Sequence, residues 1–346
     1  MSGGVDSSVA ALLLKKEGYD VTGVFMKNWS DPLANECPWK KDLADFHDVC
    51  KILQIPGRIE VFEAQYQKKV VQYMIEGYKK GITPNPDMLC NREIKFKVFL
   101  EKARALGADY IATGHYVRKK RAIKGKRKIF KLLQAIDLNK DQSYFIALLN
   151  QRQLRYSLFP IGNYTKPAIR KIAKKAKLPV HNKKDSQGIC FIGKVKFKEF
   201  IREYIEPHPG IIKDTNGAQV GRHDGLMFYT IGQRHGLGIG GGKPYFVVEK
   251  NKRSNRLIVG IGNADKKLFK EEAKLINMHW IAGCAPKLPY ACKARIRYRQ
   301  PLQGATIEKK GNGIIIRFKK RQRAVTPGQF AVLYKKGEMI GGGAIV

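Results

Sequence analysis

The stretch MSGGVDSS, residues 1–8, decides the fold that the rest of the chain is expected to adopt. Gly3 and Gly4 allow the backbone to turn tightly, and Asp6, Ser7 and Ser8 open the apolar helix that follows. This turn predicts a phosphate-binding loop, because the first N–H groups of a helix have no partner within it. The loop lacks the lysine of the GxxxxGK[ST] type. A glycine turn that only caps a helix is the alternative.

Strands and helices alternate after this loop. Strands are expected at residues 19–29, 58–64 and 108–116, with a helix over residues 43–53. The alternation predicts an α/β domain built on a parallel sheet with helices on both faces. Ligands of such sheets bind at the carboxyl ends of strands, where Met26, Gly114 and His115 fall. A phosphate loop normally follows a central strand, so we expect the reading frame to encode about 8 to 12 further apolar residues ahead of Met1.

The composition of the 346-residue chain sets its class. The length favours two or three domains. No run approaches the roughly twenty apolar residues of a membrane span, and the N-terminus lacks a secretory signal pattern, so we expect a cytoplasmic protein without membrane contact. The six cysteines contain no CxxC pair. They therefore favour reduced thiols, catalytic ones among them, over a disulfide framework or a protein metal site.

The charge of the chain is strongly positive. With 66 Lys and Arg against 29 Asp and Glu, the formal net charge is +37. This excess predicts a polyanionic partner, nucleic acid first of all. Drift in genomic composition is the alternative, and both explanations can hold together. Cations gather in residues 118–131, a hairpin-like run around Gly125, and in a helix expected to start after Thr165 as its N-cap.

Two segments place a cysteine where its thiol could take part in a reaction. In GITPNPDMLCN, residues 81–91, two prolines stiffen the backbone that presents Asp87 and Cys90 beside the start of a helix, where the dipole favours thiolate. In DSQGICFIG, residues 185–193, glycines flank Cys190 on an expected loop. A small buried hydrophobe is the alternative interpretation of such a cysteine.

The second half of the chain is expected to be β-rich. Its texture predicts domains at residues 1–204, 205–267 and 268–346, the second a small β-rich module and the third a β-barrel. The stretch ACKARIRYRQ, residues 291–300, alternates between cationic and apolar residues. We expect a barrel strand whose anion-facing side carries Lys293, Arg295, Arg297 and Arg299. Turns are expected at residues 311–313, 326–329 and 336–338.

Nine motifs follow one another along nearly the whole chain: SGGVDSS, FMKNW, TPNPDMLCN, ATGHY, NKDQSYF, DSQGICFIG, YTIGQRHGLGIGG, RYRQ and TPGQ. In this order they resemble the bacterial and mitochondrial tRNA-specific 2-thiouridylases, and the first resembles the PP-loop of the ATP pyrophosphatases. The resemblance implies a sulfurtransferase that replaces the 2-oxygen of the wobble uridine with sulfur in lysine, glutamate and glutamine tRNAs. It also implies a PP-loop domain, a small central domain and a C-terminal β-barrel.

The resemblance further implies roles for the matching residues. ATP would be bound by Met1, Ser2, Gly3, Gly4, Val5, Asp6 and Ser7, with Met26 and Gly114 lining the adenosine. The target base would meet Asn85, Pro86 and Asp87, the last as acid/base. Cys190 would carry a persulfide and Cys90 would be its partner thiol. Other contacts with tRNA would come from His115, Lys140, Asp141, Gln142, Arg297, Tyr298 and Gln329.

The chemistry of thiolation requires these parts for its own reasons. The C2 carbonyl of uracil is a poor electrophile, so ATP must first convert it to an adenylate, with Mg²⁺ offsetting the phosphate charge. The uridine must leave its stack, which is easiest in an anticodon loop. A cysteine persulfide supplies sulfur as nucleophile, and a second cysteine resolves the S–S bond by thiol exchange. We expect a cysteine desulfurase or a sulfur-relay protein as donor, and no tightly bound cofactor.

Two other functions remain open at this point. Another PP-loop enzyme, similar to the argininosuccinate or GMP synthetases, would need no cysteine pair and would stay active with alanine at Cys190. A tRNA-binding homologue without catalysis would bind RNA but would not cleave ATP.

Overall fold

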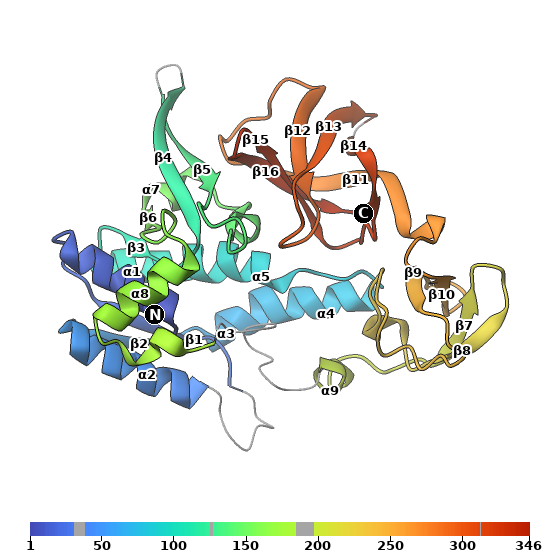
Figure 1. Ribbon diagram of the computed structural model, residues 1–346, viewed down its shortest axis with the longest axis horizontal. Coiled ribbons are helices and arrows are strands. Elements are labelled where there is room, and N and C mark those ends of the chain that lie inside the picture. Colours follow the sequence, from blue (N-terminus) through green and yellow to red (C-terminus); the bar gives the residue numbers. More distant parts are fainter. Residues whose placement is uncertain (31–38, 125–126, 185–196, 312) are drawn as a thin grey trace.

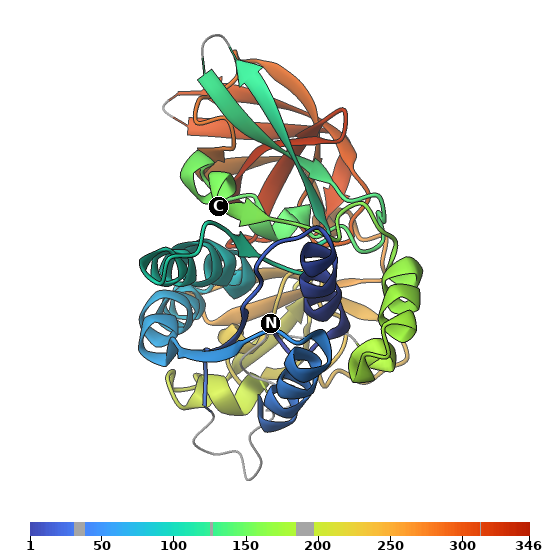
Figure 2. The same ribbon diagram turned by 90° about the vertical axis from the view of Figure 1, so that its left-hand side faces the viewer.

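Helix α1, Val5–Lys16, begins directly after the glycine pair, as the sequence predicts. The computed structural model describes residues 1–30, 39–124, 127–184, 197–311 and 313–346 (Figure 1). The apolar side of α1 is buried in a core that it shares with α2, Trp39–Leu53, and α8, Lys166–Lys175. Figure 2 shows these three helices on one face of the molecule. The phosphate loop therefore lies at the end of a helix that packing holds on two sides.

The strands of the α/β domain form two separate parallel pairs. Strand β1, Gly23–Lys27, pairs with β2, Gly57–Val61, and β3, Ile111–Ala112, pairs with β6, Ser157–Leu158. Among the described residues no strand joins the two pairs, so the expected sheet is present only as these pairs. Strand β3 is shorter than predicted, because the chain beyond Ala112 crosses the phosphate loop, whose backbone Gly114 touches.

Two long composite helices lie between the pairs of strands and the rest of the molecule (Figure 1). One consists of α3, Glu63–Tyr66, a π-helical segment, Gln67–Val71, and α4, Gln72–Lys79. The other consists of α5, Pro86–Leu89, a π-helical segment, Cys90–Val98, and α6, Phe99–Ala105. The second starts earlier than the sequence suggested, because Asn85 caps it and Pro86 fits its first position.

The shorter helices include one correction. Helix α8 starts after the N-cap Thr165, as predicted. The sequence predicts that a helix begins in NKDQSYFIALLN, residues 139–150, but the structure has only a 3₁₀ turn there, Ser143–Ile146. The carboxylate of Asp141 accepts the Ser143 amide at 3.2 Å and its hydroxyl at 3.0 Å, and such local bonds compete with a regular helix. The others are α7, Gln151–Arg155, a 3₁₀ turn, Pro179–Asn182, and α9, Phe197–Arg202.

The central module is a small sheet with the strand order β8-β7-β10-β9. Its strands are β7, Gly210–Asp214, β8, Gln219–His223, β9, Tyr245–Asn251, and β10, Arg256–Ile261, with a 3₁₀ turn, Leu226–Phe228. The segment 229–242 contains no helix or strand, and several of its glycines have positive φ, as expected for tight turns.

The C-terminal strands close into a barrel, because β11 pairs with both β14 and β16. In chain order they follow a 3₁₀ turn, Lys266–Leu268, and are β11, Phe269–Trp280, β12, Tyr290–Arg295, β13, Gln303–Lys310, β14, Gly313–Arg323, β15, Phe330–Lys335, and β16, Glu338–Ile345. The turns expected at 326–329 and 336–338 are present. The fold class predicted from the sequence is therefore confirmed.

The predicted basic hairpin also forms, and it links two domains. Strand β4, Val117–Lys124, pairs along its length with β5, Arg127–Gln134. Strand β5 then pairs with β16 through Leu132 and Leu133, so the hairpin extends the sheet of the barrel. No helix of the described residues is long and apolar enough to cross a membrane.

The prediction of a single cationic face on residues 291–300 is wrong. Strand β12 ends at Arg295, which is buried, and Arg299 lies beyond it in a turn with a φ of 63°. The Arg295 guanidinium is 3.2 Å from the buried Asp141 carboxylate of the α/β domain. Alternation identified the two sides of the strand, but the side carrying Arg295 packs against another domain.

Candidate active site

The phosphate loop is held so closely that Gly3 has no room for a side chain. Gly3 has a φ of 62°, and a Cβ there would lie 2.2 Å from the backbone oxygen of Asp42. A Cβ at Gly114 would lie 2.7 Å from the backbone carbon of Asp6 and the backbone nitrogen of Ser7. Helix α2 and the segment after β3 therefore fix the loop on two sides, as a preformed anion cradle requires.

The serines of the loop bond to one another and leave the loop compact. The Ser2 amide donates to the Ser7 hydroxyl at 3.2 Å, and that hydroxyl donates to the Gly4 carbonyl at 3.1 Å. Ser8 donates to the same carbonyl at 2.9 Å. Helix α1 has no side-chain cap at Gly4, so its first N–H groups remain directed at whatever occupies the cradle.

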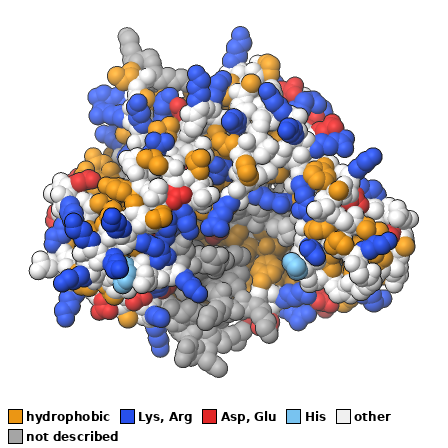
Figure 3. Space-filling view, in the orientation of Figure 1, with side chains coloured by type: hydrophobic (Ala, Val, Ile, Leu, Met, Phe, Trp, Pro, Cys, Tyr) orange, Lys and Arg blue, Asp and Glu red, His pale blue; other side chains and the backbone are white. Residues whose placement is uncertain are grey.

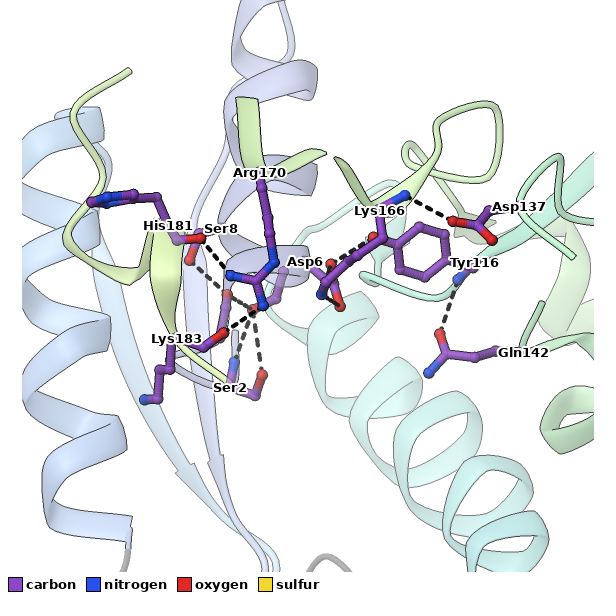
Figure 4. Close-up of polar contacts among 12 residues, drawn as sticks. Ser2, Asp6, Ser8, Tyr116, Asp137, Gln142, Lys166, Arg170, His181 and Lys183 are labelled. Atoms are coloured by element: carbon purple, nitrogen blue, oxygen red, sulfur yellow. Dashed lines mark hydrogen bonds and ion pairs between the residues drawn. The ribbon is translucent and has the colours of Figure 1, made fainter. Parts of the chain in front are cut away.

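Asp6 is the polar centre of the loop (Figure 4). Its carboxylate accepts two bonds from Nζ of the buried Lys166, one to each oxygen at 2.8 Å, and a third from the Tyr116 hydroxyl at 2.8 Å. The sequence analysis missed Lys166. A signal existed, because a lysine in the first turn of a helix opposes the helix dipole and needs a compensating partner.

A second lysine lies on the other side of the loop. Lys183 donates to the Gly3 carbonyl at 2.9 Å, to Asp42 at 2.6 Å and to Asp45. Burial acts against the charge, but the bonds with the two aspartates raise the pKa of Lys183 above its ordinary value. Arg170 of α8 donates to the Lys183 carbonyl at 2.8 Å and so fixes this segment (Figure 4). Two lysines therefore fix the loop, Lys166 through the Asp6 carboxylate and Lys183 through the Gly3 carbonyl.

Met1 and Met26 lie at the same end of the domain. The Met1 amine donates to the carbonyl of Val24 in β1. Met26 follows two residues later in the same strand and is half-buried. Met26 and Gly114 thus lie at the carboxyl ends of β1 and β3, the position in which α/β domains bind ligands.

The expected target-base loop is joined to the barrel. Asn85 accepts the Met88 amide at 3.3 Å as N-cap of α5 and donates to Gln329 of the barrel at 3.2 Å. Gln329 donates in turn to the carbonyl of Thr83 at 2.9 Å. Gly328, with a φ of 91°, approaches so closely that a Cβ would lie 2.6 Å from the Thr83 oxygen. Asn85 and Gln329, far apart in the sequence, therefore form one polar unit.

Asp87 and Cys90 lie on the first turns of the same helix, three residues apart and hence on one side of it. Burial raises the pKa of Asp87, while the charge of Lys95 acts in the opposite direction. Cys90 is buried, and no disulfide links the four cysteines in the described ranges, Cys50, Cys90, Cys284 and Cys292. Cys190 lies outside the described residues, so the structure gives no distance between the two thiols of the expected pair.

The residues expected to contact tRNA differ in their burial and in the groups that they contact. His115 is buried beside Phe96, its Nδ1 is 2.9 Å from the Thr113 hydroxyl, and burial holds its pKa well below the ordinary value. Gln142 accepts the Tyr116 amide at 3.0 Å. Tyr298 packs on Phe145 with ring centroids 4.6 Å apart.

Asp141 faces inwards between the hairpin and the barrel. Its exposed fraction is 1%. Besides Arg295 and Ser143, the carboxylate accepts the amide of Ala135 at 3.1 Å and the side-chain amide of Gln134 at 3.1 Å. This carboxylate fixes the 140–142 segment on the barrel, so Lys140, which is less buried, is the better placed of the two for an RNA phosphate.

A cleft of about 440 Å³ opens between the central module and the barrel, beside the target-base loop. Its walls are Thr230, Ile231, Gly232, Gln233, Arg297, Thr326 and Gln329. Burial lowers the pKa of Arg297, and the neighbouring charge of Arg323 acts in the same direction. From the sequence, the glycine-rich residues 225–242 predict only tight turns, and nothing in them indicates that residues 230–233 complete this cleft.

Comparison with known proteins identifies the family. Residues 1–194 match the profile described as tRNA methyl transferase HUP domain, residues 198–261 the tRNA methyl transferase PRC-barrel domain, and residues 270–345 the aminomethyltransferase beta-barrel domain. All of the chain aligns, at 50% identity over 348 residues, with 93% of tRNA-specific 2-thiouridylase MnmA 2 of Geobacillus kaustophilus. The chain belongs to the tRNA-specific 2-thiouridylase family. The MnmA proteins of Geobacillus thermodenitrificans and Francisella tularensis subsp. tularensis, covered over 93% and 98% of their lengths, are 49% and 48% identical.

The contact between the target-base loop and the barrel gives a first prediction for this 2-thiouridylase family member. The Gly328→Ala variant should unfold several degrees below the wild type, because the added Cβ must displace Thr83 and a positive φ strains alanine. Gly337→Ala is the matched control, since Gly337 has a φ of 78° and nothing within 4 Å. Differential scanning calorimetry compares them. An equal loss in both variants would mean that the Thr83 contact contributes nothing.

Proposed function

We propose that this protein catalyses the ATP-dependent 2-thiolation of the wobble uridine in lysine, glutamate and glutamine tRNAs. The observation that carries the proposal is that one chain contains two kinds of site. In the phosphate loop, Lys166 holds the Asp6 carboxylate. The helix that carries Asp87 and Cys90 is bonded to the barrel through Asn85 and Gln329. One half of this arrangement suits a nucleotide and the other suits a base. The three domain ranges that we propose for it are 1–204, 205–267 and 268–346.

ATP fits the loop. The glycines allow close approach to phosphate, Lys166 and Lys183 hold the loop through Asp6 and through the Gly3 carbonyl, and Met26 and Gly114 would line the adenosine. Mg²⁺ would be held with the ATP phosphates, and the Asp6 carboxylate is the group of the loop that could bind it. When bound, the ion would offset phosphate charge and polarise the α-phosphate.

The uracil oxygen attacks the α-phosphorus of ATP, which forms an adenylate at O2 and releases pyrophosphate. Asp87 is the group that takes the N3 proton of the base. Its raised pKa brings it nearer to the working range of a general base than an exposed aspartate would be. Asn85 and Gln329, which fix the loop, would orient the base beside it.

Sulfur then enters from a persulfide on Cys190. The terminal sulfur attacks C2, AMP leaves with the oxygen, and C2 is joined to Cys190 through a disulfide. The Cys90 thiolate attacks the sulfur of Cys190, which releases 2-thiouridine and leaves a Cys90–Cys190 disulfide. A thiol reductant restores the pair. The persulfide sulfur comes from a cysteine desulfurase or a sulfur-relay protein, and the reaction takes place in the cytoplasm.

The products of ATP cleavage test the proposal. Turnover should yield AMP and pyrophosphate, at about one equivalent per thiolated uridine, and only with substrate tRNA and Mg²⁺ present, because the base is the nucleophile that cleaves ATP. Radiolabelled ATP separated by thin-layer chromatography measures this. ADP and phosphate as the stoichiometric products would contradict it.

A methyl transferase, the word in two of the matched descriptions, is the second candidate. Methyl transfer would use neither the phosphate loop with its two lysines nor a thiol on the target-base helix. An active Cys190→Ala variant that methylates tRNA would favour it.

A further inference from the structure

The β4–β5 hairpin has a surface that the proposed reaction does not use. Figures 1 and 2 both show the strands β4 and β5 rising beside the barrel and away from the helices of the α/β domain. Residues 117–134 contain no Asp or Glu, and their cations are Arg118, Lys119, Lys120, Arg121, Lys124, Lys126, Arg127, Lys128 and Lys131.

Two of these cations attach the hairpin to the rest of the protein, and a third bonds within it. Arg118 of β4 donates to the Gln134 carbonyl of β5 at 2.7 Å. Lys119 donates to the carbonyls of Leu154 and Ser157 at 3.0 and 2.5 Å. Lys131 bonds to Glu338 of β16 at 2.7 Å. The base of the hairpin is therefore fixed to both neighbouring domains.

Lys120, Arg121 and Lys128 differ from the attached cations in their exposure and in their surroundings. All three are exposed, and within the described part of the chain no acidic group lies within 4 Å of any of them. We call these three residues the arm cations. Figure 3 shows Lys and Arg side chains gathered at its upper left, where Figure 1 places the β4 and β5 strands. Lys120 lies opposite Lys131 in the register, and of the two only Lys131 has an acidic partner, Glu338, within the described residues. The charges of the arm cations are therefore available to a bound polyanion.

An apolar residue accompanies the arm cations. Ile123 is 77% exposed, lies directly opposite Lys128, and shares its side of the ribbon with Arg121. Cations beside an exposed apolar side chain suit a nucleic-acid backbone, in which phosphate alternates with ribose.

The position of the hairpin in the chain connects it to the proposed RNA site. Strand β4 directly follows His115 and Tyr116, and β5 leads within a few residues to Lys140 and Gln142. We infer that the β4–β5 hairpin is an arm that binds the double-helical stem of the tRNA whose anticodon loop occupies the active site. The inference rests on the proposed function. RNA stems are recognised by shape through phosphate and 2′-hydroxyl contacts across a shallow minor groove, which a narrow cationic ribbon can follow without reading sequence.

The experiment compares two triple variants of the full chain. Lys120→Gln, Arg121→Gln and Lys128→Gln together form the arm variant. Arg253→Gln, Lys266→Gln and Lys270→Gln form the control, which removes three exposed cations elsewhere and changes the net charge equally. Binding of full-length tRNA and of a plain RNA duplex is measured over a salt series, with thermal unfolding to verify the fold.

The arm variant should bind both RNAs about tenfold or more weakly at 0.1 M salt, and its log–log salt slope should fall by about one to three units, since each phosphate contact contributes somewhat less than one. The control variant should retain the wild-type slope. An unchanged slope in the arm variant, or an equal loss in both variants, would overturn the inference.

Thiolation separates the remaining outcomes. If the arm variant binds tRNA normally and thiolates it with inorganic sulfide but not with the donor protein, the arm binds an acidic donor instead and the inference is wrong. If the wild type binds RNA through the arm but never thiolates it, the proposed function fails while the arm remains. Weaker binding should raise KM for tRNA and leave kcat at saturating tRNA unchanged, because the arm cations do not touch reacting atoms.

Discussion

Replacing Cys190 with serine is expected to lower tRNA thiolation by roughly a thousandfold or more, because a hydroxyl cannot carry the persulfide that supplies sulfur. Adenylation should survive, since activation of the carbonyl precedes sulfur attack and the phosphate loop is built from other residues. The measurement combines thiolated uridine per tRNA with tRNA-dependent pyrophosphate release. The expected result is pyrophosphate without thiolation.

The other cysteines provide the controls. Cys90→Ser should still accept a persulfide on Cys190, detected by mass, but should stall in releasing the product. Cys284 is exposed, and burial raises the pKa of Cys292 to about 11, so it is no nucleophile near neutral pH. Serine at either should leave thiolation near the wild-type rate. Full thiolation by Cys190→Ser would exclude the mechanism, and an equal loss in all four variants would indicate a folding defect.

Local chemistry explains what the sequence could predict. A glycine pair before an apolar helix, a Thr165 cap and an alternating strand each express their structure within a few residues, so their elements were predicted correctly. The cationic hairpin could be predicted as well, because two cationic runs flank one glycine. The order of the nine motifs predicted the domain architecture through the family that they resemble.

Contacts between distant segments explain what it could not. The bond between Asn85 and Gln329 joins residues 244 positions apart, and neither neighbourhood encodes it. Arg295 has the sequence signature of an exposed cation, yet it is buried because Asp141 reaches it from another domain. Lys166 was overlooked for the same reason, since its partner Asp6 lies at the other end of the α/β domain sequence. A sequence pattern shows which residues share one side of a helix or strand, but it does not show which part of the protein packs against that side.

The Gly114→Ala variant is expected to lose about 100-fold in the ATP-dependent step. Its new Cβ would lie 2.7 Å from the backbone of Asp6 and Ser7, and backbone cannot rotate away as a side chain can. The loop must therefore shift, and a displacement of this order at a site that aligns a phosphate costs about two powers of ten in rate. Single-turnover pyrophosphate release at saturating ATP measures the step, and ATP binding by calorimetry gives an activity-independent readout.

The matched control for this variant is Gly221→Ala in the central module, where the added Cβ would meet only Ile212 and Ile239 at 3.6 Å. That is an ordinary contact distance, so adenylation and ATP affinity should stay near the wild-type values. Because Gly114 packs on the loop and not on the barrel, its substitution should leave tRNA binding intact, and only the nucleotide readouts should fall. Wild-type pyrophosphate release by Gly114→Ala would show that the loop does not position the phosphates. Loss of tRNA binding together with ATP binding would mean that the substitution unfolds the domain.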